Sequence, residues 1–450
     1  MRTTLGSMAL VSILAAACGS SATEQSPVVD GSGGATVSPD SGTTGGAKDA
    51  GSGGKATTGG STGAGGTTGA GGTTGAGGSP GTGGMPVAQG CDGNQAAGTW
   101  VNVTPAGIDM TKSWGGMHSI FVDPARASDI YVTADSQGVY KSTDCGCTWT
   151  KTNTGQNADK LNVGRQWGGA IWNDSPSKPP VLYLPLGYGS GLLWKSTNGG
   201  TDWTSIWDNN IYASDGTTNI SSDVGGDLGG PMLLSKDHLI VYLHSYWGSG
   251  GNNGLFETTD GGGKWIVHNS KTFNFQPHSD TAFGIDDDTW IVSHGTTYPN
   301  SEQYRTTDRG VTWNIVTTNT WLSGGLKVGS TYYATGNGIY KTTDLGVTWT
   351  RIDVGYKTMF AFFASDKKMY LGCGNDYGDR NFKLKTAPIG NDTTWTDYPV
   401  PDAAGLFWGK GNNEDIGSAV PAYGVVTFDG THYIVVTSNF KGGVWRYVEP

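Results

Sequence analysis

The stretch Ser142-Thr143-Asp144-Cys145-Gly146-Cys147-Thr148-Trp149 decides the fold, because the chain repeats its pattern. The pattern is a hydroxyl residue, an aspartate or asparagine two positions later, then a glycine and a tryptophan. Clear further copies occupy residues 196–203, 258–265, 306–313 and 342–349, and a degenerate copy runs from Lys385 to Trp395. Repetition at such spacing indicates a fold assembled from similar supersecondary units.

Each copy lies between two short β-like runs, for example residues 138–141 and 149–151 around the first copy. The aspartate can accept hydrogen bonds from the amides of its own turn, and the glycine can adopt a positive φ. The tryptophan then enters the next strand, where its large ring can be buried between sheets. The repeated stretch is therefore predicted to be a hairpin turn between two strands of a recurring sheet.

The pattern S/T-x-D-x-G-x-x-W resembles the Asp box, or BNR repeat. That motif is typical of sialidases, glycoside hydrolase family 74 xyloglucanases, sortilin-type receptors and photosystem assembly factors. The resemblance implies an all-β propeller fold. These relatives perform unrelated functions and the motif is a structural turn, so we expect none of the repeated aspartates to be catalytic.

The closing tryptophans recur at positions 149, 203, 265, 313, 349 and 395, a spacing that suits four-stranded propeller blades with unequal loops. The first blade is predicted to contain strands at 116–122, 130–133, 138–142 and 149–151. Inner strands of the later blades are predicted near 167–172, 228–234, 279–285, 324–328, 359–364 and 420–427.

The last repeat is incomplete, and the other end of the chain can complete it. Residues 443–447 match the third strand of the other blades, and residues 98–103 read like the end of a box and the strand after it. An N-terminal strand that pairs there would close the ring and remove exposed sheet edges. We therefore predict a single seven-bladed propeller over residues 91–450.

The cysteines fit this closure. Cys91 lies just before the closing strand, on the face that carries the first box. An exported protein can oxidise cysteine pairs, so Cys91 is predicted to pair with Cys145 or Cys147.

The N-terminal segment has the features of an export signal. Residues 1–18 contain Arg2, an apolar run and Cys18, and residues 15–19 resemble a lipobox, which implies lipidation of Cys18. Residues 19–90 are rich in glycine, serine and threonine and are predicted to form a disordered tether. We expect a bacterial cell-envelope protein, lipid-anchored at the outer membrane or secreted, whose boxes lie on the tether side.

The composition narrows the class of partner. The net charge is −10, only 15% of residues are charged, and no block of basic residues is present. This argues against nucleic acid, and against a membrane beyond the lipid anchor itself. Abundant tryptophan and tyrosine suit a polysaccharide or oligosaccharide, whose sugar rings stack on aromatic side chains. We expect a monomer without a cofactor or metal motif, although calcium in the channel would leave no motif.

In the propellers that the motif resembles, the loops entering inner strands and those between second and third strands share the face opposite the boxes. Taken singly, residues there are more simply explained by structure, but their shared location indicates a site. The same loops also carry Trp321, Glu302, Asp376 and Arg380. The catalytic candidates are Asp135, His118, Arg165, His244, Tyr246, Asp227 and Asp280. The substrate-binding candidates are Trp114, Trp167, Tyr188, Trp247, His278, His294 and Tyr298.

Several functions compete for this face. The sialidase arginine triad and Arg-Ile-Pro motif are missing, which disfavours that family. Residues 135–141 are similar to the segment carrying the first catalytic aspartate of family 74, which implies that Asp135 is a catalytic carboxylate. Its partner acid would then be Asp227 or Asp280.

Two other functions stay open. A polysaccharide lyase would use Arg165 to neutralise a uronate, with His118, His244 or Tyr246 as base or acid. A propeller that only binds a glycan or a protein would need the aromatic residues alone.

Overall fold

The computed structural model describes residues 85–91, 95–110, 116–164, 166, 168–186, 193–223, 227–244, 254–268, 281–297, 300–318, 320–356, 358–374, 383–400, 421–439 and 442–450. The predicted signal segment and all but the last residues of the predicted tether lie outside these ranges.

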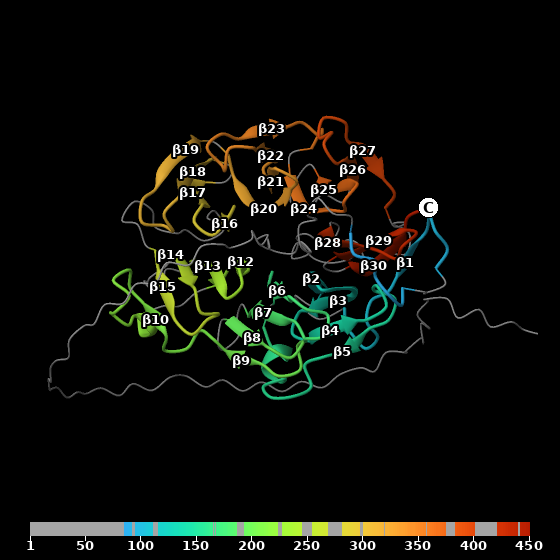
Figure 1. Cartoon of the computed structure of the whole chain (residues 1–450), viewed down its shortest axis with the longest axis horizontal. Helices are drawn as coiled ribbons and strands as arrows, with labels where there is room; N and C mark the ends of the chain where they lie inside the picture. The colour runs from blue at the N-terminus through green and yellow to red at the C-terminus, as the bar shows by residue number, and fades with distance from the viewer. Residues whose placement is uncertain are drawn as a thin grey trace, which may run out of the picture. The chain divides into compact units, whose positions relative to one another are not determined.

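The described chain is an all-β, seven-bladed β-propeller, as the repeats predicted. Seven sheets follow one another around a ring (Figure 1), and their strands pair antiparallel except at one outer edge of the third sheet. The first sheet has the strand order β2 (Met117–Asp123), β3 (Arg126–Ala134), β4 (Gly138–Ser142) and β5 (Thr150–Lys151). The second has β6 (Ala170–Trp172), β7 (Val181–Pro185), β8 (Leu193–Ser196) and β9 (Thr204–Ser205).

The fourth to sixth sheets repeat this simple order. The fourth has β16 (Thr281–Gly284), β17 (Trp290–Thr297), β18 (Asn300–Thr306) and β19 (Asn314–Thr318). The fifth has β20 (Leu322–Val328), β21 (Thr331–Gly336), β22 (Ile339–Thr342) and β23 (Thr350–Ile352). The sixth has β24 (Thr358–Ala364), β25 (Lys368–Gly374), β26 (Lys383–Pro388) and β27 (Thr396–Tyr398).

The third sheet is more elaborate than the sequence predicted. Its inner strand is split into β11 (Asp227–Leu228) and β12 (Met232–Ser235), which both pair with β13 (His238–His244). The sheet continues with β14 (Gly254–Thr258) and β15 (Trp265–Val267). An extra strand, β10 (Ile211–Tyr212), pairs parallel to β15 at the outer edge. The repeat gives no signal for β10, because it comes from the connection between blades.

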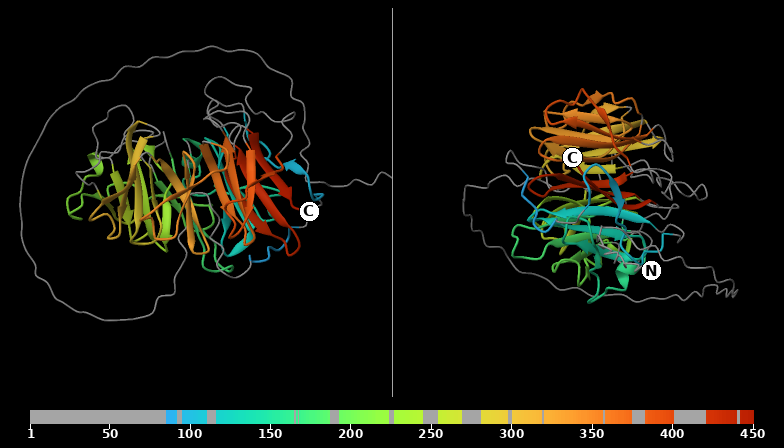
Figure 2. Two further views of the ribbon diagram at one scale, coloured as in Figure 1. Left: turned by 90° about the horizontal axis from the view of Figure 1, so that it is seen from above. Right: turned by 90° about the vertical axis from the view of Figure 1, so that its right-hand side faces the viewer.

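The N-terminal strand closes the seventh sheet, as predicted. β1 (Trp100–Asn102) pairs antiparallel with β30 (Gly443–Val448), with Trp100 opposite Tyr447. The sheet continues with β29 (Tyr433–Asn439) and β28 (Pro421–Phe428). Figure 2 shows the blue N-terminal segment beside the red C-terminal strands. The ring is thus closed by joining the two ends of the propeller in one sheet.

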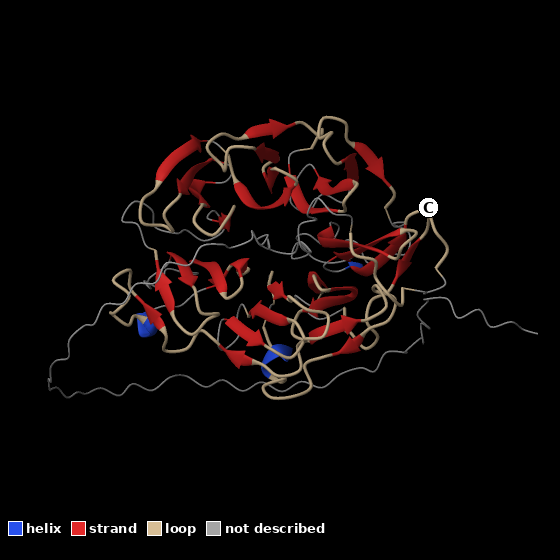
Figure 3. Cartoon of the chain, in the orientation of Figure 1, coloured by secondary structure: helices blue, strands red, loops and turns tan. Residues whose placement is uncertain are grey.

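The helical segments η1 (Lys160–Asn162) and η2 (Ser221–Asp223) are short 3₁₀ turns. Strands and loops make up almost all of the remaining described chain (Figure 3). No helix among the described residues is long and apolar enough to cross a membrane.

The repeated stretches form the predicted hairpin turns, here called box turns. In the first, the Ser142 hydroxyl donates to Asp144 Oδ1 at 2.6 Å and accepts the Gly146 amide at 2.8 Å. Asp144 Oδ1 also accepts the Thr148 amide at 2.8 Å. Gly146 has φ +83° and the residue before it, Cys145, has φ +59°. Each box turn therefore satisfies its own amides, which supports a structural role for its aspartate.

The closing tryptophans follow the prediction only in part. Trp203 and Trp265 are fully buried, as expected for rings between sheets. By contrast, Trp149, Trp313 and Trp349 are only partly buried and pack at the edges of hydrophobic clusters.

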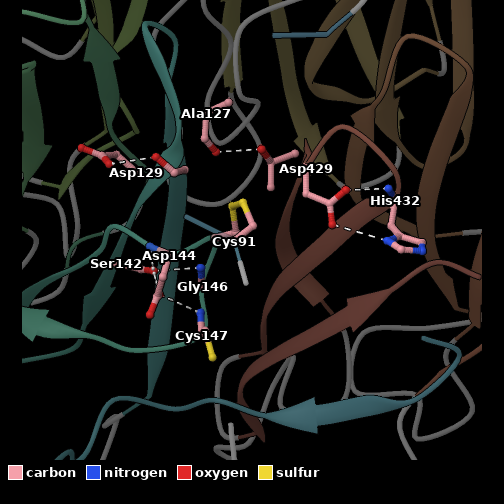
Figure 4. The surroundings of a disulfide bond; sticks show 12 residues. Cys91, Ala127, Asp129, Ser142, Asp144, Gly146, Cys147, Asp429 and His432 are labelled. Carbon is pink, nitrogen blue, oxygen red and sulfur yellow. Dashed lines mark hydrogen bonds and ion pairs between the residues drawn. A yellow bond between two sulfur atoms is a disulfide. The ribbon is translucent and has the colours of Figure 1, made fainter. Parts of the chain in front are cut away.

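A disulfide links the closing segment to the first box turn, because Cys91 is bonded to Cys145 (Figure 4). The structure thereby selects Cys145 from the two predicted partners. The preceding residues also pack at this end of the ring: the Ala88 amide donates to the Phe428 carbonyl at 2.7 Å. The described residues before β1 therefore contact the propeller at the end that carries the box turns, here called the box end.

Candidate functional site

The sheet order places the described members of the predicted site at the end of the ring opposite the box turns. In every sheet the first strand starts, and the second strand ends, at that end. We call it the loop end; among the described residues it contains the start of β2, the end of β3, the end of β13 and the end of β17. His118, Asp135, His244 and His294 all lie there.

His118 and Asp135 are brought together in the first blade. The distance from His118 Nε2 to Asp135 Oδ2 is 3.6 Å, and the two residues are 6% and 2% exposed. The register of β2 against β3 shifts between Met117 and Ile120, so His118 sits in a bulge. Bulges often re-aim a side chain next to an active site. Together the two residues form a buried imidazole–carboxylate contact.

The turn after β3 holds Asp135 in place. Its amide donates to the Gly116 carbonyl at 2.8 Å, and the Ser136 hydroxyl donates to its Oδ1 at 2.9 Å. Ser136 itself has φ +56°, and its amide donates to the Gly164 carbonyl at 3.0 Å. The Asp135 carboxylate is therefore held by the Ser136 hydroxyl, and the Asp135 backbone is held by Gly116.

The glycine in the same segment, Gly138, is required for structural reasons. Gly138 has φ +100°, and a Cβ there would lie 2.5 Å from Asn153 Oδ1 and 2.7 Å from Asn162 Oδ1. Next to it, the Gln137 side chain accepts the Asp109 amide at 2.7 Å and donates to the Asp109 carbonyl at 3.0 Å. The similarity of residues 135–141 to a catalytic segment is thus also explained by packing of this loop.

Neighbouring blades support the pair from both sides. The Ser438 hydroxyl of β29 donates to the His118 carbonyl at 2.5 Å. The Ser119 hydroxyl donates to the carbonyls of Gln166 at 3.1 Å and Gly168 at 2.8 Å, at the entry to the second blade. The first blade is therefore tied at the loop end to the seventh and to the second.

Two further candidates meet in the third blade. Asp227 in β11 is the register partner of His244 in β13. Their backbones lie side by side at the loop end, and their side chains are outside what the structure describes.

The fourth blade contributes a second group. His294 is the register partner of Glu302, and the Tyr304 hydroxyl donates to Glu302 Oε2 at 2.6 Å. The His294 and Tyr304 rings have centroids 6.2 Å apart. Burial and the Glu302 carboxylate raise the pKa of Tyr304 to about 12, so its phenol keeps its proton at neutral pH.

The sequence predicts Glu302 on this face but indicates no catalytic or binding role for it. The structure places it within the third strand, β18, and not in the loop before that strand. The partnership with Tyr304 depends on both residues sharing one face of β18.

The other catalytic and substrate-binding candidates lie outside the described ranges, and the structure does not place their side chains. They are Trp114, Arg165, Trp167, Tyr188, Tyr246, Trp247, His278, Asp280 and Tyr298, together with the predicted lipidation residue Cys18. Within the described residues, no group of three or more His, Cys, Asp or Glu side chains is placed to hold a metal ion.

Comparisons with known proteins agree on the fold. No protein-family model matches the chain, and no curated protein matches it. Among solved structures, a family 74 enzyme from Niastella koreensis is similar at 16% identity with a TM-score of 0.51; the match covers 78% of this chain and 55% of that one.

Two further structures are similar at lower TM-scores. The family 74 xyloglucanase from Xanthomonas campestris has 15% identity, coverage of 77% and 53%, and a TM-score of 0.47. YCF48 from Cyanidioschyzon merolae has 12% identity, coverage of 79% and 99%, and a TM-score of 0.47. This chain thus spans about half the length of the family 74 structures, and the likeness establishes the propeller fold.

Proposed function

We propose that this propeller is a carbohydrate-active enzyme, a glycoside hydrolase that cleaves a polysaccharide or oligosaccharide at the loop end. The observation that carries the proposal is the contact between His118 and Asp135 in the first blade. A carboxylate beside an imidazole can fix the orientation of the ring and stabilise its protonated form. Such a pair can move a proton to or from a bound substrate.

Hydrolysis of a glycosidic bond needs one group to protonate the leaving oxygen and another to take a proton from water. In the proposed reaction Asp135 is the catalytic carboxylate and accepts the proton of the attacking water. The partner acid is Asp227 or Asp280, and the aromatic candidates at the loop end stack on the sugar rings.

The first test is incubation with a panel of neutral and acidic polysaccharides, followed by measurement of new reducing ends. Asp135→Asn should lower kcat by about 10²–10⁴-fold, the usual contribution of a positioned acid or base. Asp344→Asn, in a box turn at the other end, is the matched control and should leave kcat unchanged. Unaltered turnover in Asp135→Asn would refute the assignment.

Elimination is the second candidate, and the position of His118 favours it. A lyase removes the proton next to a uronate carboxylate, and an imidazole oriented by Asp135 is suited to that step. Arg165 would neutralise the uronate, and His244 or Tyr246 would serve as the other proton carrier. Products would then absorb in the ultraviolet band of unsaturated uronates, and His118→Ala would abolish that absorbance.

A propeller that binds a glycan or protein without cleaving it is the third candidate. The burial of His118 and Asp135 favours it, because a catalytic pair needs access to substrate. Saturable glycan binding with no new reducing ends and no ultraviolet product would support this alternative.

We further propose a location at the bacterial cell envelope, through a lipid on Cys18 or by secretion. The packing of residues 85–91 at the box end supports an orientation in which the loop end points away from the membrane. Cys18→Ser should move the protein from the detergent phase to the aqueous phase. Size-exclusion chromatography of that variant tests the proposed monomer.

A further inference from the structure

A buried histidine joins the third and fourth blades at the box end of the ring. His238, at the start of β13, is 5% exposed, and its Nε2 lies 2.8 Å from Glu257 Oε1 in the same blade. Its Nδ1 lies 3.1 Å from Asp287 Oδ1, in the turn between β16 and β17 of the next blade. One imidazole ring therefore contacts carboxylates from two blades.

The protonation of His238 follows from this geometry. An ionised carboxylate can only accept a hydrogen bond, and a neutral imidazole carries a single N–H. His238 can donate to Glu257 and Asp287 together only as an imidazolium, with a proton on each nitrogen. Loss of one proton leaves a nitrogen lone pair facing a carboxylate oxygen.

The hydrogen bonds from the two neighbouring histidines keep the Glu257 carboxylate ionised. Glu257 receives a second contact through Oε2, from His268 Nε2 at 2.9 Å. Burial alone would raise the pKa of Glu257, but the hydrogen bonds from His238 and His268 outweigh it and lower the pKa to about 2. Glu257 thus stays ionised throughout the range in which histidines titrate. His268, with one carboxylate contact, needs only one N–H.

Asp237, which precedes His238, pairs with Lys195 at 4.0 Å, and further charged groups lie in the neighbouring turns of the fourth blade. The Arg309 guanidinium pairs with Asp288 at 2.7 Å, and its charge also faces Glu257 and Asp287. The Asp286 carboxylate accepts the amides of Asp288 and Thr289 within its own turn. The carboxylates in this region outnumber the one arginine named here, Arg309. A positive charge on His238 therefore offsets part of the negative charge of these carboxylates.

We propose that His238 is a proton-dependent latch between the third and fourth blades. In its protonated form it bridges Glu257 and Asp287 and holds the two sheets together. The bridge needs a proton on both ring nitrogens, so it is complete in the protonated ring and lacks one hydrogen bond in the neutral ring. The latch lies at the end opposite the proposed site, so it controls stability independently of the proposed activity.

The test compares thermal unfolding of the wild type and Asp287→Asn at pH 5.5 and pH 8.5. At pH 5.5 the variant should melt a few degrees lower, because it loses one ionic acceptor. At pH 8.5 the introduced amide can donate to the deprotonated ring nitrogen, so the variant should match or exceed the wild type. This reversal with pH distinguishes a latch from a plain structural contact.

His432→Gln is the matched control, since His432 is half-exposed and contacts a single carboxylate, Asp429, at 3.4 Å. It should not show the reversal. Histidine NMR on the wild type should find protons on both nitrogens of the His238 ring at pH 5.5. A constant difference between wild type and Asp287→Asn at both pH values, or a neutral His238 at pH 5.5, would overturn the proposal.

Discussion

Gly138 shows how one residue shapes the candidate site. It follows the Asp135 turn with φ +100° and leaves no space for a side chain against Asn153. Only glycine adopts this φ without strain while allowing so close an approach. The backbone conformation that positions Asp135 therefore depends on a glycine, which has no side chain that could take part in a reaction.

Gly138→Ala should destabilise the propeller by roughly 2–4 kcal/mol, because backbone strain and a steric clash add together. Gly355→Ala is the control: its φ is +78°, but no atom lies within 4 Å of the added Cβ. We expect about 1 kcal/mol there. Urea unfolding of both variants measures the difference, and equal costs would contradict the packing argument.

Glu257 gives a second prediction at this scale. Its folded pKa of about 2 is below the ordinary glutamate value, so its contribution is present above about pH 4.5 and is lost as pH falls toward 2. Glu257→Gln should therefore flatten the loss of stability between pH 4.5 and 2. The exposed residue Asp353 provides the control Asp353→Asn. An unchanged acid profile in Glu257→Gln would contradict the assigned hydrogen bonds.

At the scale of elements, ring closure depends on a three-residue strand. β1 covers Trp100–Asn102 and pairs only with β30 among the described strands. Such a short pairing gains little by itself, and the disulfide between Cys91 and Cys145 holds the preceding segment next to it. The buried Arg446 side chain adds a hydrogen bond to the Cys145 carbonyl at 3.0 Å.

Removal of the disulfide by Cys91→Ser should lower the free energy of unfolding by about 4 kcal/mol, the loop-closure entropy for a separation of 54 residues. Guanidinium unfolding checks the value. Cys145→Ser should give the same loss, because it removes the same bond. A loss much below 1 kcal/mol would show that β1 closes the ring without the disulfide.

At the scale of the whole molecule, the C-terminal end of the propeller ties the seventh blade to the sixth. Glu449 is 5% exposed and accepts hydrogen bonds from the hydroxyls of Tyr370 at 2.7 Å and Tyr398 at 2.8 Å. Its other oxygen accepts from Lys368 Nζ at 2.6 Å. The pairing of β1 with β30 joins the two ends of the ring. The Glu449 carboxylate joins the seventh blade to the sixth.

Glu449→Leu should cost roughly 1–3 kcal/mol, because it leaves buried hydroxyl groups without their acceptor. Glu449→Gln keeps one acceptor oxygen and should cost less. Differential scanning calorimetry of both variants ranks them, and an equal or reversed order would contradict the hydrogen-bonding role.

The sequence by itself determined the elements that repeat. The box turns, the order of strands within a blade, the seven-blade count and closure by an N-terminal strand all follow from local patterns. Such patterns are readable because turn chemistry and tryptophan spacing act over a few residues. The parallel strand β10 was not predictable, since it lies in a connection and pairs at long range.

Only the tertiary structure decided which side chains meet. It selected Cys145 over Cys147, set His118 beside buried Asp135, and joined His238 to Asp287 of another blade. These contacts depend on how sheets pack around the ring, and residue spacing along the chain does not encode such distances. Residues 142–149, the stretch that decides the fold, thus specify a turn. The contacts between the candidate functional side chains are determined by the packing of turns and blades.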